Sequence, residues 1–567
     1  MSVAVLGSGG AGALTVGSLL FEVSARLGCY GLLTRSVGPQ IRGGEAASLM
    51  RLSAEPVDCV DDHFDILLAM DWKNADRYAA EIPLGPASII VTDPAGGEVP
   101  GAFANTGARI HEVRLGEIAK QVPNGRTNMV VLGALAEILE LPRDALLQAV
   151  RTQLGEKGEQ VLQSSEQAAE LGRRAAAEIG KHPLPRANGH TRGHWMITGN
   201  EAAGLGAVRG GIRFVAAYPI TPATDLMEWL SPALARIGGT LVQAEDELAS
   251  ANMIIGASFG GVPALTATSG PGLSLMMESL GLAVTSEIPI VVVDVMRGGP
   301  STGLPTKSEQ GDLNIAIYGM HGDAPHLVLA PTSIADCLFT SQWAVFLAEA
   351  LQTPAIVLSD QSMGQARIVM NAPGEIPFRA IRDKASRFEN YRRYVVTESG
   401  VSPMAIPGTP GGQYTADGLE HSPNALPSTR AEDHAAQLDK RLRKINAFNY
   451  GGHWADVEGR GQFAIVTWGS MTCVIREALR RLRNEEFADI RLLAMRLLSP
   501  AQPARMAAAL EGVERVLVIE QNHSGQLFHY LRAQYELPGI VESFHRPGPS
   551  VIRPGEMAGI IRHWRTA

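Results

Sequence analysis

Short runs of Val, Ile and Leu alternate with longer stretches of helical periodicity along most of the chain, as in α/β domains built on parallel sheets. The first run, Val3–Leu6, leads into a glycine-rich turn over Gly7–Gly12 and then into a helix of small and apolar residues. Ile288–Val295 is rich enough in Val and Ile to predict a central parallel strand. The other predicted strands are 30–33, 65–69, 87–91, 214–217, 463–467, 490–494 and 516–520.

Interruptions of this pattern divide the chain into domains. Residues 143–180 are rich in Ala, Glu and Leu and predict helix, whereas 181–194 contain prolines without periodicity and predict a linker. Residues 371–455 carry Pro and Gly clusters and predict an irregular segment. The sequence thus predicts three α/β domains with parallel sheets, over 1–180, 195–370 and 456–567.

Composition excludes several classes of protein. With 45% hydrophobic and 19% charged residues, the chain is expected to be packed rather than disordered. Its net charge of −9 and the lack of a long basic run disfavour nucleic-acid binding. The most apolar later stretch, Leu280–Val295, is too short and too interrupted to span a bilayer, and the first residues lack a basic leader. A soluble, cytoplasmic protein with no membrane partner is therefore expected.

The cysteines argue against a metal centre in this chain. Cys29, Cys59, Cys337 and Cys473 lie far apart and show no CxxC or similar ligand spacing. The sequence therefore predicts neither a metal site nor an iron–sulfur cluster held by this chain alone. Sparse cysteine also suits a reducing cytoplasm.

The amino-terminal glycines are the first candidate site. Backbone N–H groups at Gly9, Gly10 and Gly12 could cradle a phosphate at the start of a helix. A nicotinamide site would also need an acid at the end of the second predicted strand, where Arg35 stands instead. Arg35 and Arg42 are the candidates to bind a phosphate-bearing ligand. A turn that merely packs strand against helix is an equally weighted alternative.

The central region carries four loops, each at the end of a predicted strand. In the first, Tyr218–Pro222, two prolines fix the turn and aim the Thr221 hydroxyl beyond the strand, where open α/β sheets bind ligands. Alternatively, Thr221 only caps a proline-rich helix entry. The second loop precedes a helix with three consecutive acids, and capping accounts for Glu245 and Asp246. The third acid, Glu247, is a candidate to protonate or orient a heterocycle.

The other two loops are Thr266–Gly272 and Asp294–Asp312, both dense in Gly, Pro and hydroxyl groups. Arg297 and Lys307 in the longer loop could bind carboxylates, the arginine in a bidentate manner. An isolated basic residue on a loop is more often simply solvated. Four such loops at successive strand ends nevertheless indicate a ligand site.

Together these motifs, YPITP, QAEDELA, TATSGPG and RGGPSTGLPTKSEQGD, resemble the alpha subunit of 2-oxoacid:ferredoxin oxidoreductases, which are thiamine diphosphate enzymes. The resemblance is closest to the fused type, in which a gamma-like domain precedes the alpha domains. GSGGAG and GPQIRGGE resemble that gamma domain, and VIEQNHSGQ at 518–526 resembles the transketolase-C-like domain. The implied fold is a Rossmann-like gamma domain, a thiamine-diphosphate pyrimidine-type domain and a transketolase-C-like domain.

The resemblance also implies roles for individual residues. Glu247, a better match than Glu245, would contact the aminopyrimidine of the cofactor, and Thr221 would lie beside cofactor and substrate. Arg297 would hold the carboxylate of the 2-oxoacid, and coenzyme A would be a co-substrate, for which the amino-terminal glycines and arginines are candidate ligands without an assignment. Further residues implied are Lys307, Ser301 and Thr302 for the substrate and Tyr218, Pro219, Ile220 and Gly270 for the cofactor.

One expected element is missing from the sequence. Thiamine diphosphate enzymes carry a Gly-Asp-Gly…Asn segment that binds the diphosphate through a divalent metal, and no GDG occurs in this chain. The resemblance therefore implies half an active site, completed by a beta subunit that carries the diphosphate site, Mg²⁺ and a [4Fe–4S] cluster in an (alpha–beta)₂ assembly. Ferredoxin is the implied electron acceptor.

The reaction implied is 2-oxoacid, coenzyme A and oxidised ferredoxin giving acyl-CoA, CO₂ and reduced ferredoxin. 2-Oxoglutarate is the favoured substrate, with pyruvate, branched-chain 2-oxoacids and indolepyruvate left open. Two other classes remain: a flavin or nicotinamide oxidoreductase that uses the amino-terminal glycines, and a non-catalytic assembly subunit. Arg35 argues against the nicotinamide version, and an assembly subunit would tolerate replacement of Glu247.

Overall fold

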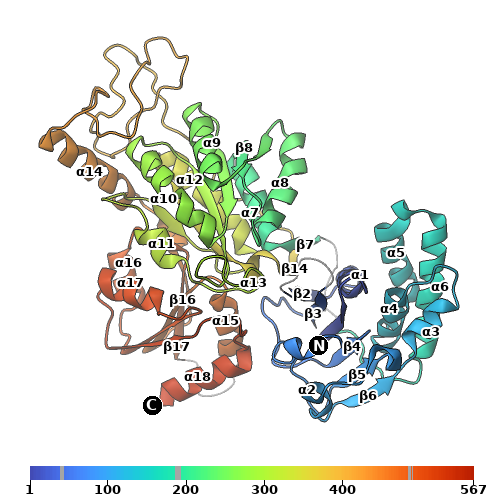
Figure 1. Ribbon diagram of the computed structural model, residues 1–567. Coiled ribbons are helices and arrows are strands. Elements are labelled where there is room, and N and C mark those ends of the chain that lie inside the picture. The colour runs from blue at the N-terminus through green and yellow to red at the C-terminus, as the bar shows by residue number, and fades with distance from the viewer. Residues whose placement is uncertain (39–43, 186–192, 483–486, 488, 567) are drawn as a thin grey trace. The chain divides into compact units, whose positions relative to one another are not determined.

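The chain packs into two compact units in the computed structural model, which describes residues 1–38, 44–185, 193–482, 487 and 489–566 (Figure 1). Arg42, one of the candidate phosphate ligands, lies outside the described residues. The first unit consists of Met1–Thr198, Ala366–Gly374 and Ser550–Ala567, and the second of Gly199–Gln365 and Glu375–Pro549. The first unit thus includes segments from parts of the sequence where the second and third domains are expected.

Eight strands form the sheet of the first unit: β1 (Ser2–Ser8), β2 (Tyr30–Val37), β3 (Glu45–Ser53), β4 (Ile66–Ala69), β5 (Ile89–Thr92), β6 (Arg109–Glu112), β7 (His194–Thr198) and β14 (Arg367–Asn371). Their order is β6-β5-β4-β1-β3-β2-β14-β7. β1, β4, β5 and β6 run parallel, while each pairing from β1–β3 onward is antiparallel.

The prediction of a parallel amino-terminal sheet is therefore wrong for half of its strands. Only residues 38–44 separate β2 from β3, too few for the crossover that parallel strands require, so the two strands pair antiparallel. β3 also lies between β1 and β2, and the parallel neighbour of β1 is β4. The acid that follows β4 is Asp71, whose carboxylate accepts a hydrogen bond of 2.8 Å from the Ser8 N–H.

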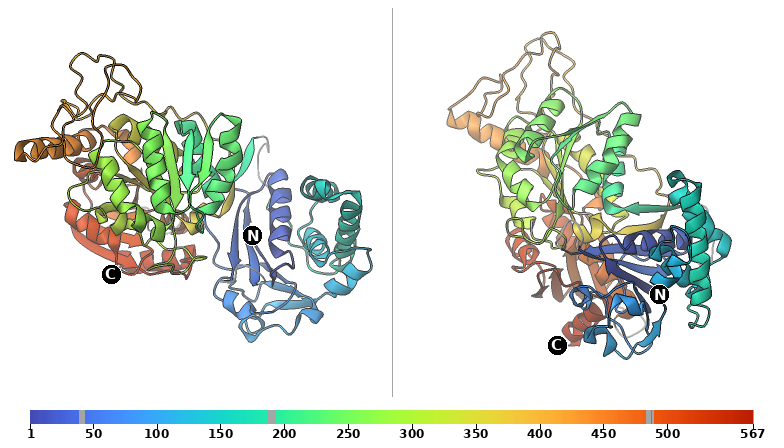
Figure 2. Two further views of the ribbon diagram at one scale, coloured as in Figure 1. Left: turned by 45° about the horizontal axis from the view of Figure 1, so that its top comes forward. Right: turned by 45° about the vertical axis from the view of Figure 1, so that its right-hand side comes forward.

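Helices cover one face of this sheet (Figure 2). α4 and α6 touch through their backbones, since a Cβ on Gly133 would lie 1.8 Å from the Ala169 carbonyl oxygen. The helices of the unit are α1 (Ala13–Arg26), α2 (Gly101–Ala104), α3 (Leu115–Lys120), α4 (Thr127–Ile138), α5 (Arg143–Leu154), α6 (Glu159–Ala175) and α18 (Pro554–Thr566), with the short turns η1 (Ala75–Tyr78), η2 (Pro94–Gly96) and η3 (Gly155–Lys157).

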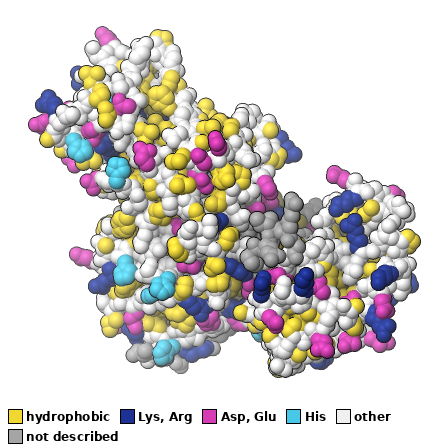
Figure 3. All heavy atoms as spheres, viewed as in Figure 1, with side chains coloured by type: hydrophobic (Ala, Val, Ile, Leu, Met, Phe, Trp, Pro, Cys, Tyr) yellow, Lys and Arg dark blue, Asp and Glu magenta, His cyan; other side chains and the backbone are white. Residues whose placement is uncertain are grey.

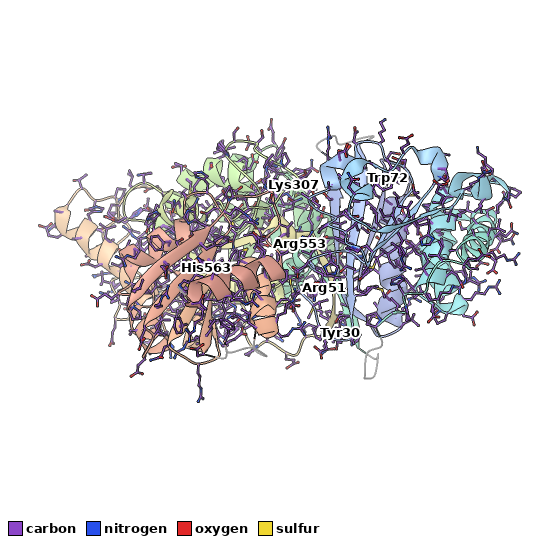
Figure 4. All side chains as sticks on the ribbon, turned by 90° about the horizontal axis from the view of Figure 1, so that it is seen from below. Tyr30, Arg51, Trp72, Lys307, Arg553 and His563 are labelled. Carbon is purple, nitrogen blue, oxygen red and sulfur yellow. The ribbon has the colours of Figure 1, made fainter. Side chains whose placement is uncertain are left out.

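The last helix, α18, is tied to the first unit by the residues at its start. Arg553, labelled in Figure 4, donates hydrogen bonds to the backbone carbonyls of Asp61 and Glu81. The Gly555 N–H donates to the carboxylate of Asp62 at 2.7 Å. The end of the chain therefore folds with its beginning.

The second unit has a central sheet with β8 (Phe214–Ala217), β9 (Thr240–Gln243), β10 (Ala264–Thr268), β11 (Val291–Met296), β12 (Leu327–Leu329), β13 (Ala355–Asp360) and β18 (Leu497–Ser499). The order is β18-β12-β13-β11-β10-β8-β9, and the β12–β18 pairing alone is antiparallel. Every residue of β11 is buried, as predicted for a central strand. The accompanying helices are α7 (Gly199–Gly210), α8 (Thr224–Arg236), α9 (Glu247–Phe259), α10 (Gly270–Thr285), α11 (Leu313–Tyr318), α12 (Asp336–Leu351) and α13 (Gln361–Gly364).

A third sheet completes the second unit, with β15 (Ala455–Glu458), β16 (Phe463–Trp468), β17 (Ile490–Met495), β19 (Arg515–Glu520) and β20 (Ile540–His545) in the order β15-β17-β16-β19-β20. Its helical elements are η4 (Gly451–Trp454), α15 (Met471–Leu482), α16 (Pro503–Ala509) and α17 (Gln526–Gln534). Three sheets with mostly parallel pairings confirm the predicted fold class. In the described part of the chain, no helix is both long enough and apolar enough to cross a lipid bilayer.

Residues 375–430 form loops that α14 (Ala431–Asn446) follows (Figure 1). The expectation of an irregular segment over 371–455 is thus wrong for α14. Most buried residues of this helix are polar or charged, Lys440 and Lys444 among them, so hydrophobic periodicity does not reveal it.

Glu287, at the end of the turn after α10, neutralises this buried charged face. Its carboxylate lies 2.6 Å from Lys440 Nζ and 2.9 Å from Lys444 Nζ, and Arg393 donates to its backbone carbonyl. None of these four residues is more than 2% exposed. Burial opposes ionisation of Glu287, but the two lysines hold the pKa of its carboxyl well below its usual range. The cluster fastens α14 to the central sheet.

Replacing Glu287 with Gln should destabilise the second unit, because two buried ammonium groups lose their counter-charge. Breaking a buried pair typically costs about 3–5 kcal/mol. Thermal or urea unfolding of the Glu287→Gln chain measures this loss, with Glu228→Gln, at an exposed position of α8, as the matched control. Equal midpoints for the two variants would contradict the role of the cluster.

Candidate active site

The turn after β8 stands at the carboxyl edge of the central sheet, as predicted. Thr221 is exposed and Tyr218 is 40% exposed, while Pro219 and Ile220 are half-buried. Asn200 donates a hydrogen bond of 3.0 Å to the Pro222 carbonyl, which fastens the end of the turn to α7. The turn therefore presents the Thr221 side chain outward from a fixed backbone.

Glu247 is the first residue of α9, and its environment differs from those of the two acids before it, Glu245 and Asp246. Asp246 is the cap, since its carboxylate accepts a hydrogen bond of 2.7 Å from the Ala249 N–H. Glu245 is exposed. Glu247 is only 7% exposed, and no described residue gives its carboxylate a hydrogen bond or an ion pair. A buried carboxylate without a partner is costly unless a ligand pairs with it.

Glycine makes room for this carboxylate at the start of α10. A Cβ on Gly272 would lie 2.7 Å from Glu247 Oε1 and 2.2 Å from Thr268 Oγ1. Any other residue at this position would displace both side chains. Thr268 and Glu247 therefore meet at one point, where a hydroxyl group and a carboxylate can contact the same ligand.

Arg297 follows β11 directly and supports the first turn. Its Nη1 donates a hydrogen bond of 2.7 Å to the Thr221 carbonyl, and its Nε is buried without a hydrogen-bond partner. Burial lowers the pKa of the guanidinium, and Asp312 opposes that shift. The structure thus places Arg297 beside Thr221, with donor capacity left beyond the Thr221 carbonyl.

The loop over 297–312 folds back on itself. The Gly298 N–H donates to the Lys307 carbonyl at 3.0 Å, and the Lys307 N–H donates to the Leu304 carbonyl at 3.0 Å. Lys307, labelled in Figure 4, is half-buried at the base of the loop, whereas Ser301 and Thr302 are exposed near its tip. The loop thus carries Lys307 and the two hydroxyl groups at different depths.

Gln310 anchors the far end of this loop to the third sheet. Its Nε2 donates to the Trp468 carbonyl at 2.9 Å, and its Oε1 accepts from the Gln521 N–H at 2.8 Å. The Gln310 N–H donates to the Gln521 carbonyl, also at 2.8 Å. Gln521 is held in turn because Glu520 is fully buried and accepts hydrogen bonds from the first turn of α17.

Two aspartates meet where β11 and the loop end. Asp294 is fully buried, and neither of its carboxyl oxygens has a hydrogen-bond partner among the N–H and hydroxyl groups of the described residues. It faces Asp312, whose oxygens would lie 2.7 and 2.8 Å from a Cβ on Gly270. Burial and the neighbouring Asp312 raise the pKa of Asp294 well above its usual range, and burial raises the pKa of Asp312 to about 6. Both carboxyl groups are therefore easier to protonate than an exposed aspartate.

Sequence reasoning did not assign functions to Asp294, Asp312 or Gln310, although all three belong to the motifs that it quotes. An aspartate inside a Val-rich strand is one signal that was available, because buried strands rarely contain an unpaired acid. The contact between Arg297 and the Thr221 carbonyl has no signal in the sequence. Gly270, expected in a loop as a cofactor-binding residue, is the first residue of α10, where it leaves room for Asp312.

The glycine candidates belong to the first unit. Gly10 and Gly12 have φ values of 90° and 92°, and a Cβ on Gly12 would lie 2.3 Å from Asn128 Nδ2. Gly9 and Gly10 are exposed. Arg35 is exposed on β2, and the register pairs it with Ser48 and Ser48 with Val5, the middle residue of β1. The structure thus places the glycines after the end of β1, and Arg35 level with the middle of that strand, two strands away.

Metal-binding groups are sparse in the described part of the chain, where no cluster of three or more His, Cys, Asp or Glu side chains is arranged to hold a metal ion. All four cysteines are buried and free.

Replacing Gln310 with Ala should release the loop, because the Trp468 carbonyl and the Gln521 N–H would be left buried without partners. Each unsatisfied group costs about 1–3 kcal/mol. The measurement is the rate of tryptic cleavage after Lys307, which should increase. The control is Gln462→Ala, which removes an exposed glutamine just before β16. A cleavage rate equal to that of the control would show that the loop does not depend on Gln310.

Two family models match this chain. Residues 2–175 match the model described as pyruvate ferredoxin/flavodoxin oxidoreductase. Residues 205–440 match the model described as pyruvate flavodoxin/ferredoxin oxidoreductase, thiamine diphosphate-binding.

Curated relatives carry related names. The chain is 36% identical over 370 residues to 2-oxoacid:ferredoxin oxidoreductase 1, subunit alpha, of Sulfurisphaera tokodaii, which covers 59% of this chain and 56% of that protein. It is 33% identical over 372 residues to 2-oxoglutarate synthase subunit KorA of Methanothermobacter thermautotrophicus, which covers 65% of this chain and 98% of that protein. The match thus spans just over half the length of the first relative and nearly all of the second.

A solved structure matches along the whole chain. It is the 2-oxoglutarate:ferredoxin oxidoreductase from Magnetococcus marinus with 2-oxoglutarate, coenzyme A and succinyl-CoA bound. The TM-score is 0.91 at 35% sequence identity, and the match covers 99% of both chains.

Proposed function

The chain belongs to the family of 2-oxoacid:ferredoxin oxidoreductase alpha subunits, and from this membership we propose that it forms half of such an enzyme's active site. The enzyme converts a 2-oxoacid and coenzyme A into acyl-CoA and CO₂ and passes two electrons to ferredoxin. The single observation that carries the proposal is the buried, unpartnered carboxylate of Glu247 at the carboxyl edge of the central sheet.

Glu247 fits the pyrimidine side of thiamine diphosphate. Its carboxylate is partly shielded from water, lacks a partner among the described residues and lies beside a hydroxyl group on Thr268. Thiamine diphosphate, when bound, would supply the carbanion chemistry that a 2-oxo carbon requires. Glu247 would hold a proton at a ring nitrogen of the pyrimidine and so would favour the reactive tautomer of the heterocycle. Tyr218, Pro219, Ile220 and Gly270 line the same edge.

Thr221 and Arg297 bind the 2-oxoacid next to this position. Arg297 is anchored by the Thr221 carbonyl and keeps donor capacity for the carboxylate beside the reacting carbonyl. The exposed Thr221 hydroxyl is available to the same substrate. Lys307, Ser301 and Thr302 lie on the adjacent loop, where they meet the distal part of the substrate.

The substrate that we favour is 2-oxoglutarate. Its second carboxylate requires a second cation, which Lys307 supplies from the loop that begins with Arg297. The relative from Methanothermobacter thermautotrophicus is named a 2-oxoglutarate synthase subunit, and the structure from Magnetococcus marinus is a 2-oxoglutarate:ferredoxin oxidoreductase. Pyruvate and branched-chain 2-oxoacids lack the second carboxylate and would not use Lys307.

Coenzyme A is the proposed ligand of the first unit. Gly9, Gly10 and Gly12 form the turn at the start of α1, where backbone N–H groups favour an anion, and Arg35 on β2, two strands from β1, is the cation that we propose for the same ligand. The solved relative contains coenzyme A, which carries phosphate groups suited to such a turn. A flavin or nicotinamide site at these glycines is the competing proposal.

The chain needs a partner, because it has no GDG segment for the diphosphate and no clustered cysteines. We propose a beta subunit that supplies the diphosphate site, Mg²⁺ and a [4Fe–4S] cluster in an (alpha–beta)₂ assembly. An apolar surface is available on α9 and α10, where Leu248, Met253 and Leu275 are 46%, 42% and 52% exposed. Figure 3 shows hydrophobic side chains over this part of the second unit.

Replacing Glu247 with Gln should abolish most turnover in the assembled enzyme, because the proton acceptor is lost while the size of the side chain is kept. We expect a loss on the order of 100-fold or more in kcat. The assay is 2-oxoacid- and coenzyme A-dependent reduction of ferredoxin by the chain purified with its beta subunit. Glu245→Gln is the matched control and should retain activity. Normal turnover of Glu247→Gln would instead favour a non-catalytic assembly subunit.

Replacing Lys307 with Ala should change substrate preference rather than chemistry. Loss of a desolvated charge partner costs roughly 2–5 kcal/mol, against under about 1 kcal/mol for an exposed charge. The kcat/KM for 2-oxoglutarate should therefore fall while that for 2-oxobutyrate stays nearly constant. Arg297→Ala should impair both substrates alike. An unchanged ratio of the two kcat/KM values in Lys307→Ala would remove the dicarboxylate assignment.

A further inference from the structure

The proposed chemistry leaves one buried titratable pair without a role, Asp294 and Asp312. Asp294 is fully buried on β11, and Asp312 closes the loop that begins with Arg297. Burying two carboxyl groups against each other costs free energy unless a hydrogen bond satisfies them. Asp294 has no hydrogen-bond partner among N–H and hydroxyl groups, so a second carboxyl group is what remains to satisfy it.

The surroundings of the pair allow one negative charge and no more. The charged groups that act on Asp312 are Asp294 itself, Glu309 on the same loop and Arg297. Among the described residues, the charged group that acts on Asp294 is Asp312. Arg297 can compensate one carboxylate, and Glu309 adds further negative charge, so a second ionisation has no counter-charge. A proton shared between the two carboxyl groups satisfies both.

We propose that Asp294 and Asp312 share one proton and act as positioning residues for Arg297, so that the pair sets the affinity of the enzyme for its 2-oxoacid. This inference rests on the proposed function, which assigns the substrate carboxylate to Arg297. Neither aspartate is proposed to touch substrate or cofactor. They act through the guanidinium that Asp312 compensates.

Asp312 is fixed on both sides, which lets it transmit this charge. Two residues earlier, Gln310 holds the loop to the third sheet. On the other side its oxygens lie against Gly270, the first residue of α10, a position that favours a negative charge. The singly charged pair therefore has its carboxylate on Asp312, where both α10 and Arg297 stabilise it.

Loss of the shared proton reverses these interactions. With both carboxyl groups ionised, repulsion pushes the end of the loop away from β11, and Arg297 loses its place against Thr221. The folded chain binds protons that the unfolded chain releases, because both pKa values are raised above their usual range. The pair's contribution to stability is therefore lost as the pH rises through those folded-state pKa values.

The first test uses a variant that mimics the protonated partner. In Asp294→Asn the amide donates permanently to Asp312 and cannot ionise. The assembled enzyme with this change should have a KM for the 2-oxoacid within about 3-fold of wild type at pH 7, since the hydrogen bond is kept. At alkaline pH its KM should stay constant while that of wild type increases. A parallel increase in both proteins would overturn the proposal.

The second variant removes the charge. Asp312→Asn leaves Arg297 without its counter-charge, so the KM should rise at every pH, on the order of 30-fold, with kcat changed much less. Glu309→Gln is the control, because Glu309 is also a partly buried acid of this loop with a pKa raised by burial. It should keep the alkaline rise in KM, although loss of the Glu309 charge, which acts on Asp312, shifts that rise toward lower pH. A fall in kcat at unchanged KM for Asp312→Asn would contradict a positioning role.

A third measurement needs no turnover and separates this inference from the proposed function. The infrared spectrum of the full wild-type chain at pH 7, minus that of Asp294→Asn, should show the carbonyl stretch of a buried protonated carboxyl group. The band should be missing in Asp294→Asn and retained in Glu309→Gln. Thermal unfolding midpoints of Asp294→Asn minus wild type should increase from pH 7 to alkaline pH. A missing band together with a flat midpoint difference would refute the shared proton, even in a fully active enzyme.

If the band is present and the enzyme has no 2-oxoacid activity, the proposed function fails while the shared proton stands. The proposed effect of the pair on the affinity for the 2-oxoacid would then fail together with the proposed function.

Discussion

Parallel pairing of β8, β10 and β11 brings the carboxyl ends of three strands to one edge of the central sheet, and every candidate active-site residue of the second unit depends on this edge. The register pairs Thr268 with Asp294, so the loops that follow begin within one strand spacing, about 4.8 Å, of each other. This proximity explains why Arg297 reaches the Thr221 carbonyl and why Asp312 reaches the start of α10. Residues nearly a hundred positions apart thus form one site because of strand order alone.

The second unit buries charge in two contrasting ways. Around Glu287, two lysines and an arginine compensate one carboxylate, and the result is a static fastening of α14. At the active-site edge two carboxyl groups lie together, and the arginine acts on only one of them, Asp312. A well-packed hydrophobic cluster in place of either charged cluster would be about as stable, because the cost of desolvating charges roughly cancels their attraction. The aspartate pair is therefore better explained by function than by stability, since it lies next to the proposed substrate site.

The sequence was most informative where apolar runs end in unusual loops, and least informative where packing partners are polar. β8, β11 and the turn at Thr221 follow from apolar runs and prolines, and these place the candidate site at a sheet edge. β3 and α14 were not predicted. The first pairs antiparallel with β2 after a connection of only seven residues, and the second buries lysines in place of leucines. The sequence does not say which of Glu245, Asp246 and Glu247 caps α9, because each of them has a side chain that can cap a helix. The structure shows that Asp246 is the cap.

The third sheet contributes to the site without supplying a side chain to the proposed chemistry. Its segment Glu520–Asn522 accepts and donates the hydrogen bonds that hold Gln310, and Gln310 fixes the end of the loop that carries Arg297 at its start. Glu520 in turn is satisfied by the first turn of α17, so the anchor is built on a helix start rather than on a mobile loop. A change in this sheet therefore reaches the substrate arginine through hydrogen bonds that can be named one by one. The motif over residues 518–526 is therefore explained by the loop that it holds in place. It can affect substrate binding through Gln310 without contacting the substrate itself.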